Sequence, residues 1–424
     1  MKVLIKKAQI NDPGSSHHGK RSDILIEAGL IKDIQATIQA DAERVIDGSD
    51  LHVSPGWVDV FANFADPGQE YKETLQTGAN AAAAGGFTDV FVIPNTSPVI
   101  DAKSAVEYVR HKSASLPVNI YPIGAISRHA EGKDLAEMYD MRASGAIAFS
   151  DGLNPVQSAG VLVKALQYVK TFDGVVIQIP DDKSVGSHGL MHEGIVSTQL
   201  GLAGKPLLAE ELLVARDIKL ARYANSKLHF TAVTSPKSLE YIRRAKESGI
   251  QVTCSVTPFH LFFTDSDIQQ YDTNLKVYPP LRPPNIVEAL RKAVSDGVVD
   301  CIATHHLPHE TDSKVVEFET AANGMIGLET CYAALKTAMP GISEARWAEL
   351  LSLNPRQIFG LDKVTIEKDS PAVVTIYQPA EQIKVTEAFF KSRSRNSAFT
   401  GKTLNGRIVG IINKDKLYIS ETKN

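Results

Sequence analysis

The sequence predicts an α/β protein with a (β/α)8 TIM-type barrel and a small β-sandwich domain that both ends of the chain form together. Two observations lead to this prediction. Strand-like runs separated by turns occur near both termini, and between them eight apolar strand-like runs alternate with segments of helical character. A barrel of this type needs about 250 residues, so a chain of 424 residues has room for a second, smaller domain.

The two ends of the chain share a pattern of short strands. Turn-forming segments, Asp12-Pro13-Gly14 and Ala28-Gly29, separate the runs near the N-terminus. We therefore assign residues 1–53 and 340–424 to the small β domain with flanking helices, and residues 54–339 to the barrel. The expected terminal strands contain Val3 and Ile5, 24–26, 31–34, 373–376, 407–412 and 416–419.

The middle of the chain shows helix signals between its apolar runs. Ser235 suits the N-cap of a helix, Pro236 its first position and Gly249 its C-terminal cap. A second helix is expected at 161–169, where apolar residues repeat with helical spacing. The eight expected strands are 57–61, 88–93, 118–123, 146–149, 174–179, 228–233, 250–257 and 299–304.

The composition excludes several classes of partner and location. A formal net charge of −4 without a basic run argues against nucleic acid as a partner. Cys254, Cys301 and Cys331 are far apart and form no Cys-x-x-Cys pair, which indicates reduced thiols in a cytoplasmic protein. The apolar run at the start is too short for a signal peptide, and the stretch 81–87 is short and broken by glycine, so no membrane span is expected.

Polar residues follow several of the expected strands. In a barrel these positions matter, because the loops at the carboxyl ends of the strands form the active site. Two of these residues, Asp181 and Asp182, are interpreted as a solvated loop or a helix cap rather than as an acid–base pair. The polar residues in these places are Asn63, Asn95, Asp151, Asp181, Asp182, His305, His306 and His309.

Several segments together resemble the dihydroorotase family. The stretch PGWVDVFANFADPG, residues 55–68, is similar to the family's opening motif P-G-x-x-D-x-H-x-H-x-R-x-P-G, and ATHHLPHE is similar to A-T-D-H-A-P-H. The order and spacing of the motifs agree through almost the whole chain, which makes the resemblance specific. The other matching segments are GANAAAAGGFTDVFVIPNTSP, GAIAFSDG, HEGIVSTQLGLAGKPLLAEELLVARDIKLA, VTPFHL, KVYPPLR, GMIGLET, LNPRQIFGL and the region 392–401.

The resemblance implies a member of the amidohydrolase superfamily. Active members hold one or two zinc ions at the barrel mouth, and the metal generates a hydroxide that attacks a ring amide, interconverting dihydroorotate and carbamoyl aspartate. Zinc requires His, Cys, Asp or Glu ligands and an open position for water. It lowers the pKa of that water by about 9 units, which corresponds to about 12 kcal/mol.

This chain departs from the family at most of the residues that should hold metal and substrate. The substrate-binding arginine falls on Ala65, the asparagine of N-P-P-L-R falls on Tyr278, and the second acid of S-D-D-G falls on Gly152. A shift of one residue would place Gln178 at the fifth-strand position, but glutamine is no better a zinc ligand. The family's metal-ligand positions are occupied by Phe61, Asn63, Asp151, Ile179, Ala232 and His305.

Some positions of the family site keep residues that could still function. Asp151 and His305 are interpreted as remnants of the catalytic positions. Asn95, Arg282 and His309 line the substrate pocket in relatives, and here they could bind an anion or simply hold the loops by hydrogen bonds. Because no complete set of catalytic residues is intact, no cofactor is expected, although active relatives use zinc.

These substitutions predict a dihydroorotase-like protein of the pyrimidine-biosynthesis family that is catalytically inactive and acts as a binding or scaffolding partner. One alternative is an active cyclic-amide hydrolase with a rewired metal site around His305, His306 and His309. A second alternative is a dihydroorotase with residual activity. The resemblance implies aspartate transcarbamoylase or an active dihydroorotase as the partner, together with assembly into a homo-oligomer.

Overall fold

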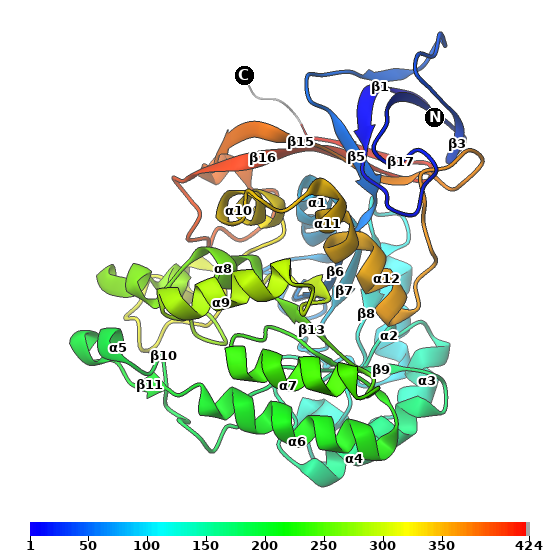
Figure 1. Ribbon diagram of the computed structural model, residues 1–424. Helices are drawn as coiled ribbons and strands as arrows, with labels where there is room; N and C mark the ends of the chain where they lie inside the picture. Colours follow the sequence, from blue (N-terminus) through cyan, green and yellow to red (C-terminus); the bar gives the residue numbers. More distant parts are fainter. Residues whose placement is uncertain (421–424) are drawn as a thin grey trace.

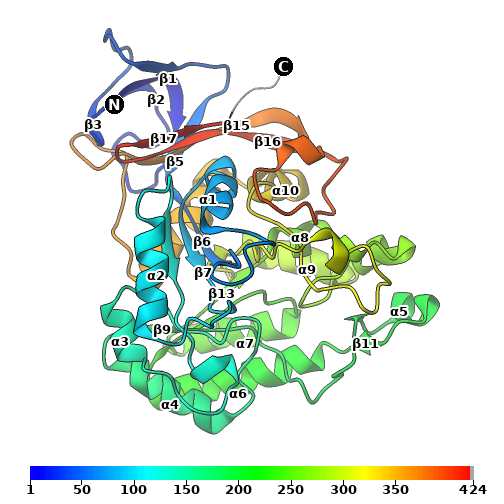
Figure 2. The same cartoon turned by 180° about the vertical axis from the view of Figure 1, so that it is seen from behind.

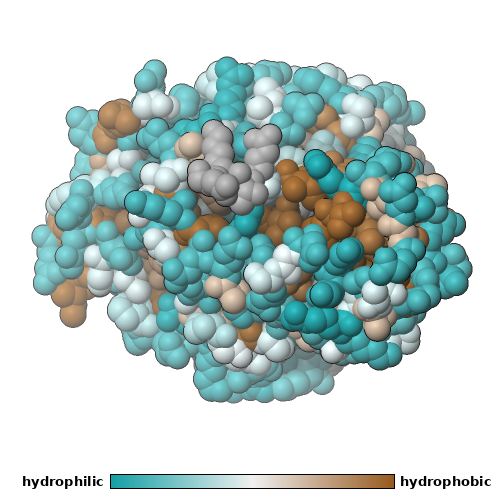
Figure 3. All heavy atoms as spheres, turned by 90° about the horizontal axis from the view of Figure 1, so that it is seen from above, coloured by the Kyte–Doolittle hydropathy of each residue, from teal (hydrophilic) through white to brown (hydrophobic). Residues whose placement is uncertain are grey.

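The computed structural model describes residues 1–420. Strands from the two ends of the chain lie together on one side of the molecule, and the remaining strands and most helices lie on the other (Figures 1 and 2). The face seen from above is mainly hydrophilic, with hydrophobic patches between polar residues (Figure 3). Among the described residues, no helix is both long enough and apolar enough to cross a membrane.

The middle of the chain contains two parallel sheets. Their strands are almost completely buried, as expected when helices cover parallel strands. The first sheet consists of β6 (Trp57–Ala62), β7 (Phe87–Val92) and β8 (Asn119–Pro122). The second consists of β9 (Val175–Gln178), β12 (Lys227–Phe230), β13 (Val252–Val256) and β14 (Cys301–Ile302).

Isolated parallel bridges join these two sheets into a ring. Phe149 pairs with Gly124 after β8 and with Val176 of β9, and Ala62 of β6 pairs with His306 after β14. We call these strands, with Phe149, the strand ring, and the carboxyl ends of its strands the ring mouth.

The fourth expected strand, 146–149, is the one that the structure does not form. Only Phe149 makes strand-like bridges there. The guanidinium of Arg142 donates to the carbonyls of Ala146 and Ile147 at 3.1 and 3.4 Å. These two carbonyls therefore accept hydrogen bonds from a side chain rather than from a neighbouring strand. The strand propensity of the segment did not reveal this alternative hydrogen bonding.

Helices cover the strand ring from outside. The helix α7 (Pro236–Glu247) begins as predicted, because the Ser235 side chain accepts hydrogen bonds from two backbone N–H groups of its first turn. Gly249 lies just beyond its end with φ of +76°, a conformation that glycine adopts without strain. The other long helices are α1 (Leu75–Ala84), α2 (Lys103–Ser113), α4 (Ala159–Lys170), α6 (Leu208–Ala224), α9 (Pro284–Ser295) and α10 (Cys331–Ala338).

Shorter helices complete this layer. The helices α11 (Glu344–Ala348) and α12 (Asn354–Phe359) are connected by one π-helical turn, and both that turn and α12 contact β6. The remaining short helices are α3 (Met138–Ala143), α5 (Ile195–Leu200) and α8 (Pro258–Phe262).

The strands of the two chain ends form one eight-stranded sheet. The antiparallel pairing of β5 (His52–Pro55) with β15 (Val373–Lys384) joins the N-terminal strands to the C-terminal ones. Neither β5 nor β4 (Arg44–Ile46) was expected from the sequence, because each is only three or four residues long. The other members are β1 (Lys2–Ile10), β2 (Arg21–Glu27), β3 (Leu30–Gln35), β16 (Thr403–Asn413) and β17 (Lys416–Ile419).

A buried ion pair ties α12 to the strand ring. The guanidinium of Arg356 lies 2.5 Å from the carboxylate of Asp89 in β7 and donates to the Gly56 carbonyl at 3.0 Å. Both charged side chains are almost inaccessible to water, with 6% and 2% of their surface exposed. Gly56 connects β5 to β6, so Arg356 links α12, the ring and the terminal sheet at one point.

Candidate functional site

The ring mouth gathers the polar residues that the sequence places after strands. Asn63 follows β6, Asn95 follows β7, Asp151 follows Phe149 and His305 follows β14. Since all strands of the ring are parallel, these residues lie at the same end of the ring. Their side chains, however, do not form one open polar site, as their hydrogen bonds show.

Apolar side chains occupy two of the family's metal-ligand positions. Phe61 and Ile179 are fully buried and belong to one hydrophobic cluster inside the ring, together with Ile93, Ile177 and Leu307. Ala232, at a third ligand position, is also completely buried. The hydrophobic interior of the ring therefore continues up to the mouth at these positions.

His305 is packed against this cluster. Its ring stacks on Phe61 with centroids 4.3 Å apart and an angle of 19° between the planes. A hydrogen bond of 2.8 Å joins its Nε2 to the Thr231 hydroxyl, and its Nδ1 has no partner. Burial is the main cause that lowers the pKa of His305 to about 3, with contributions from His260 and His229. The ring is therefore neutral at physiological pH.

Two other metal-ligand positions carry side chains whose oxygens are already occupied. Asn63 Oδ1 accepts the backbone N–H of Ala65 at 2.7 Å, which fixes the turn after β6. Asp151 accepts the backbone N–H and the hydroxyl of Ser127 at 2.9 and 2.5 Å. Burial raises the pKa of Asp151 above its usual range, although the Ser127 hydrogen bonds act in the opposite direction.

Gln178, the alternative at the fifth strand, is also engaged. Its amide forms hydrogen bonds of 3.3 and 3.2 Å with the backbone N–H and carbonyl of Val156. Either alignment of this strand therefore leaves the ring mouth without a free donor atom at that position.

The pocket residues that the chain shares with its relatives hold loops together. Asn95 accepts the N–H of Leu153 at 2.9 Å and donates to the Asp151 carbonyl at 3.2 Å. His309 is bound through Nε2 to the Asn323 carbonyl at 2.9 Å. Burial lowers the pKa of His309 to about 4.

Arg282 belongs to a buried polar cluster behind the mouth. It donates to the Thr234 hydroxyl at 2.9 Å, contacts His192 Nδ1 at 3.2 Å and lies 3.8 Å from the Glu210 carboxylate. Burial and the charge of Arg282 lower the pKa of His192 to about 4, so that this ring is neutral and can accept a hydrogen bond. Neither Arg282 nor Asn95 nor His309 lines the cavity at the mouth.

The interpretation of Asp181 as a solvated or capping residue is wrong. Its carboxylate is buried, forms an ion pair of 2.9 Å with Lys205 and accepts a hydrogen bond from the Tyr278 hydroxyl. Lys205 belongs to the short strand β11 (Gly204–Lys205), which pairs with β10 (Met191–His192). The sequence could not show this contact, since Lys205 and Tyr278 come from segments far apart in the chain. Asp182 is half-buried and caps the turn, because its carboxylate accepts the backbone N–H and the hydroxyl of Ser184.

The residues at the mouth do not fit a zinc ion. Three ligand positions, Phe61, Ile179 and Ala232, have no donor atom, and the oxygens of Asn63 and Asp151 are occupied as described above. Zinc sites require three or four His, Cys, Asp or Glu donors. Within residues 1–420, no three such residues are grouped so that they could hold a metal.

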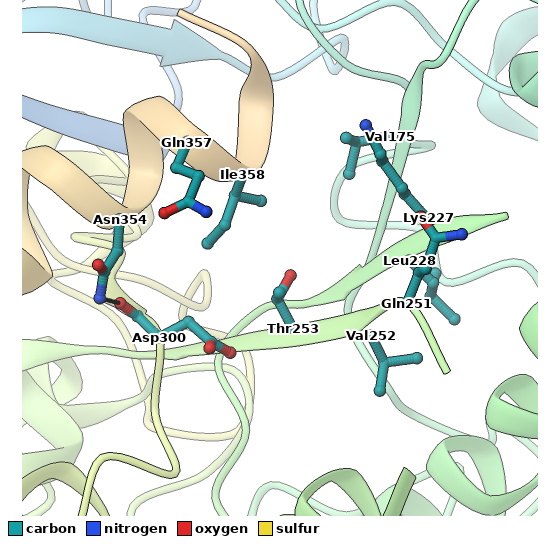
Figure 4. Close-up of a pocket in the computed structure, with 10 residues that line it drawn as sticks. All are labelled: Val175, Lys227, Leu228, Gln251, Val252, Thr253, Asp300, Asn354, Gln357 and Ile358. Atoms are coloured by element: carbon teal, nitrogen blue, oxygen red, sulfur yellow. Dashed lines mark hydrogen bonds between the residues drawn. The ribbon is translucent and has the colours of Figure 1, made fainter. Parts of the chain in front are cut away.

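Two cavities lie at opposite ends of the ring. A cavity of about 520 Å³ at the mouth is lined by Asp181, Lys205 and Tyr278, among others. The other, of about 350 Å³, lies where β9, β12 and β13 begin, and α12 contributes Asn354, Gln357 and Ile358 to its wall (Figure 4). In α/β proteins, ligand sites lie at the carboxyl ends of parallel strands, so the candidate site is the cavity at the mouth.

Known proteins similar to this chain cover nearly its whole length. A family model described as Dihydro-orotase-like matches residues 51–238. The dihydroorotase of Pelotomaculum thermopropionicum is 41% identical over 409 residues, covering 96% of either chain. The dihydroorotase of Geotalea daltonii is 40% identical over 410 residues, again covering 96% of each.

A solved structure shows the same fold. The L-hydantoinase (dihydropyrimidinase) from Arthrobacter aurescens superposes with a TM-score of 0.87 at 22% identity, and the superposition covers 99% of this chain and 96% of that one.

Proposed function

Since the chain belongs to the dihydroorotase family of the amidohydrolase superfamily, we propose that it is a non-catalytic member that serves pyrimidine biosynthesis as a binding or scaffolding partner. The observation that carries the proposal is the stacking of Phe61 on His305. Two positions that would hold metal ligands are filled by a packed pair of rings. Neither can approach a metal without breaking up the hydrophobic cluster that includes Phe61 and Ile179.

The magnitude of the loss supports inactivity. Without a metal, an attacking water keeps its ordinary pKa, which forgoes about 12 kcal/mol of activation. Ala65 also removes the side chain that holds the substrate in relatives. Loss of groups that only orient the metal ligands would lower metal affinity or activity by about 10–100-fold, which is far less than loss of the metal itself.

The test combines metal content and activity on one sample. After incubation with excess zinc and dialysis, the protein is expected to retain far less than one zinc per chain. Dihydroorotate hydrolysis is expected to equal the rate in buffer, with an active dihydroorotase assayed in parallel as the positive control. Phe61→His alone is expected to restore neither property, because donors at 63, 179 and 232 are still missing. About one tightly bound zinc per chain would overturn the proposal.

The alternative of a rewired hydrolase has one observation in its favour. His305 Nδ1, His306 Nε2 and His309 Nδ1 are buried and have no hydrogen-bond partner. However, His306 Nε2 lies 3.4 Å from the carboxylate of Glu73. In the same experiment, zinc that is retained by the protein and lost in a His309→Ala variant would favour this alternative.

The architecture belongs to the proposal as well. We assign the strand ring to a (β/α)8 barrel formed by residues 54–339, and the terminal sheet to a β-sandwich domain formed by 1–53 and 340–424. The parallel bridges that close the ring and the pairing of β5 with β15 support this assignment. Chains of this fold place ligand sites at the carboxyl ends of the strands.

A scaffolding role requires a partner, and the proposed partner is aspartate transcarbamoylase or an active dihydroorotase, in an assembly that also contains further copies of this chain. Support comes from α6, where Leu208, Leu212 and Tyr223 are 51%, 44% and 76% exposed. Positions spaced by 4 and 11 residues lie on one side of a helix. Exposed apolar stripes of this kind mark interaction surfaces.

Affinity purification of the tagged chain from its native cell tests this proposal. One of the two enzymes is expected to be recovered in stoichiometric amount, and Leu212→Lys is expected to reduce the recovery at least about tenfold if the stripe contributes about 1.4 kcal/mol or more. Lys292→Gln, an exposed lysine on α9 rather than on α6, serves as the control. Recovery of neither enzyme would refute the partner assignment.

A further inference from the structure

The cavity at the ring mouth has charged and apolar side chains in its wall. We propose that it binds a small carboxylic acid with an apolar body, held by Lys183 and Lys205. The proposal does not require the chain to be inactive, because none of the residues involved is at a metal-ligand position of the family.

The first argument is the cost of the buried charges. Asp181 and Lys205 are 4% and 7% exposed, and their side chains form an ion pair of 2.9 Å on the wall of the cavity. Removing an ion pair from water costs several kcal/mol per ion, so buried pairs are poor stabilisers of a fold. A buried charged pair on the wall of a cavity is therefore a candidate for ligand binding.

The second argument is the balance of charge in the cavity wall. Two ammonium groups, Lys183 and Lys205, and one carboxylate, Asp181, line it, which leaves one positive charge in excess. The Asp181 carboxylate already has two partners, Lys205 and the Tyr278 hydroxyl. The excess charge therefore favours an anionic ligand.

The third argument is the free hydrogen-bonding capacity. An ammonium group has three N–H donors, and Lys205 uses them toward Asp181 at 2.9 Å and, weakly, toward the Val185 carbonyl at 3.5 Å. Lys183 is exposed, and within the described part of the chain only its backbone N–H is engaged, by Gln157. The cavity wall thus has N–H donors that are not engaged, and a carboxylate could accept hydrogen bonds from them.

The rest of the wall selects an apolar body. Leu153, Leu190, Val277 and Leu307 face the same cavity. A volume of about 520 Å³ is within the range of about 300–1,000 Å³ in which small-molecule sites occur. A ligand that places its carboxylate between the two lysines and its apolar part on the leucines satisfies both sets of groups.

Isothermal titration calorimetry with hexanoate tests the proposal, with hexanamide as its neutral counterpart and dihydroorotate as a polar anion. Hexanoate is expected to bind at least about tenfold more tightly than hexanamide, because hydrogen bonds from ammonium groups to a carboxylate are stronger than those to a neutral amide. Hexanoate is also expected to bind more tightly than dihydroorotate. Lys183→Gln should weaken hexanoate binding about tenfold, whereas Lys292→Gln, an exposed lysine on α9, should not change it.

Lys205→Gln is expected to abolish binding, and Lys183→Gln decides the question if that variant does not fold. Equal affinity for hexanoate and hexanamide would overturn the proposal. So would tighter binding of dihydroorotate, or an unchanged affinity in Lys183→Gln. The zinc content of the same sample, measured separately, distinguishes this failure from a failure of the proposed function.

Discussion

Replacing Arg356 by methionine is expected to lower the free energy of unfolding by about 3–5 kcal/mol, because the Asp89 carboxylate would stay buried without its counter-charge. Asp89 would keep only neutral partners, among them the Thr88 hydroxyl at 2.7 Å, the Asn119 amide at 2.9 Å and the Tyr121 hydroxyl. Methionine fills much of the same volume, so the loss reports the charge and its hydrogen bonds rather than a cavity. Urea unfolding at neutral pH measures it.

A surface pair of the same type provides the control. Arg243 and Glu247 form an ion pair of 2.5 Å on α7, but their side chains are 46% and 59% exposed. Arg243→Met should therefore cost less than about 1 kcal/mol. Combining Arg356→Met with Asp89→Asn should recover part of the loss, since the buried charge is then removed. A double variant as unstable as Arg356→Met would show that the charge is not the cause.

Gly152→Asp, which restores the acid expected from the family motif, should destabilise this chain by about 2–5 kcal/mol. Gly152 has φ of +62°, and a Cβ atom there would lie 1.8 Å from Asn95 Oδ1. A left-handed backbone costs about 1–2 kcal/mol for a residue with a side chain. Overpacking of a filled interior adds about 1–3 kcal/mol. Thermal or urea unfolding would measure the sum.

Gly132 separates the two contributions. It also has a left-handed backbone, with φ of +70°, but a Cβ atom added there would have no neighbouring atom within 4 Å. Gly132→Asp should therefore show the backbone cost alone. Asn95→Ala in the Gly152→Asp background should recover stability by removing the clash. If Gly132→Asp and Gly152→Asp lower the free energy of unfolding equally, the Asn95 side chain moves away at no measurable cost and the clash does not contribute.

Both predictions concern residues within the family motifs, LNPRQIFGL and GAIAFSDG. Arg356 keeps its place and fixes the junction between α12, the ring and the terminal sheet. At Gly152 the Asn95 amide occupies the space that a side chain would need. The two predictions therefore probe a contact that supports the fold and a contact at the mouth of the ring.

Most of the longer strands and helices could be predicted from the sequence, as could the lack of donor atoms at several expected ligand positions. Apolar runs located the seven strands of the ring, whereas the eighth expected strand, 146–149, does not form; Ser235, Pro236 and Gly249 located the ends of α7. These features can be predicted because they depend on backbone preferences and side-chain chemistry of residues that are close together in the sequence. The absence of donor atoms in Phe61, Ile179 and Ala232 likewise needs no structure to be recognised.

The contacts at the ring mouth came to light only in the folded structure. The stacking of Phe61 on His305 and the contact of Asp181 with Lys205 and Tyr278 join segments far apart in the chain. Arg142 is only four and five residues from Ala146 and Ile147, yet the apolar run at 146–149 did not show that the Arg142 guanidinium donates to their carbonyls. Such contacts depend on the directions of side chains and on which strands become neighbours. No local sequence pattern predicts these contacts, because an aspartate and a lysine that are far apart in the sequence form a buried ion pair only when folding brings them together.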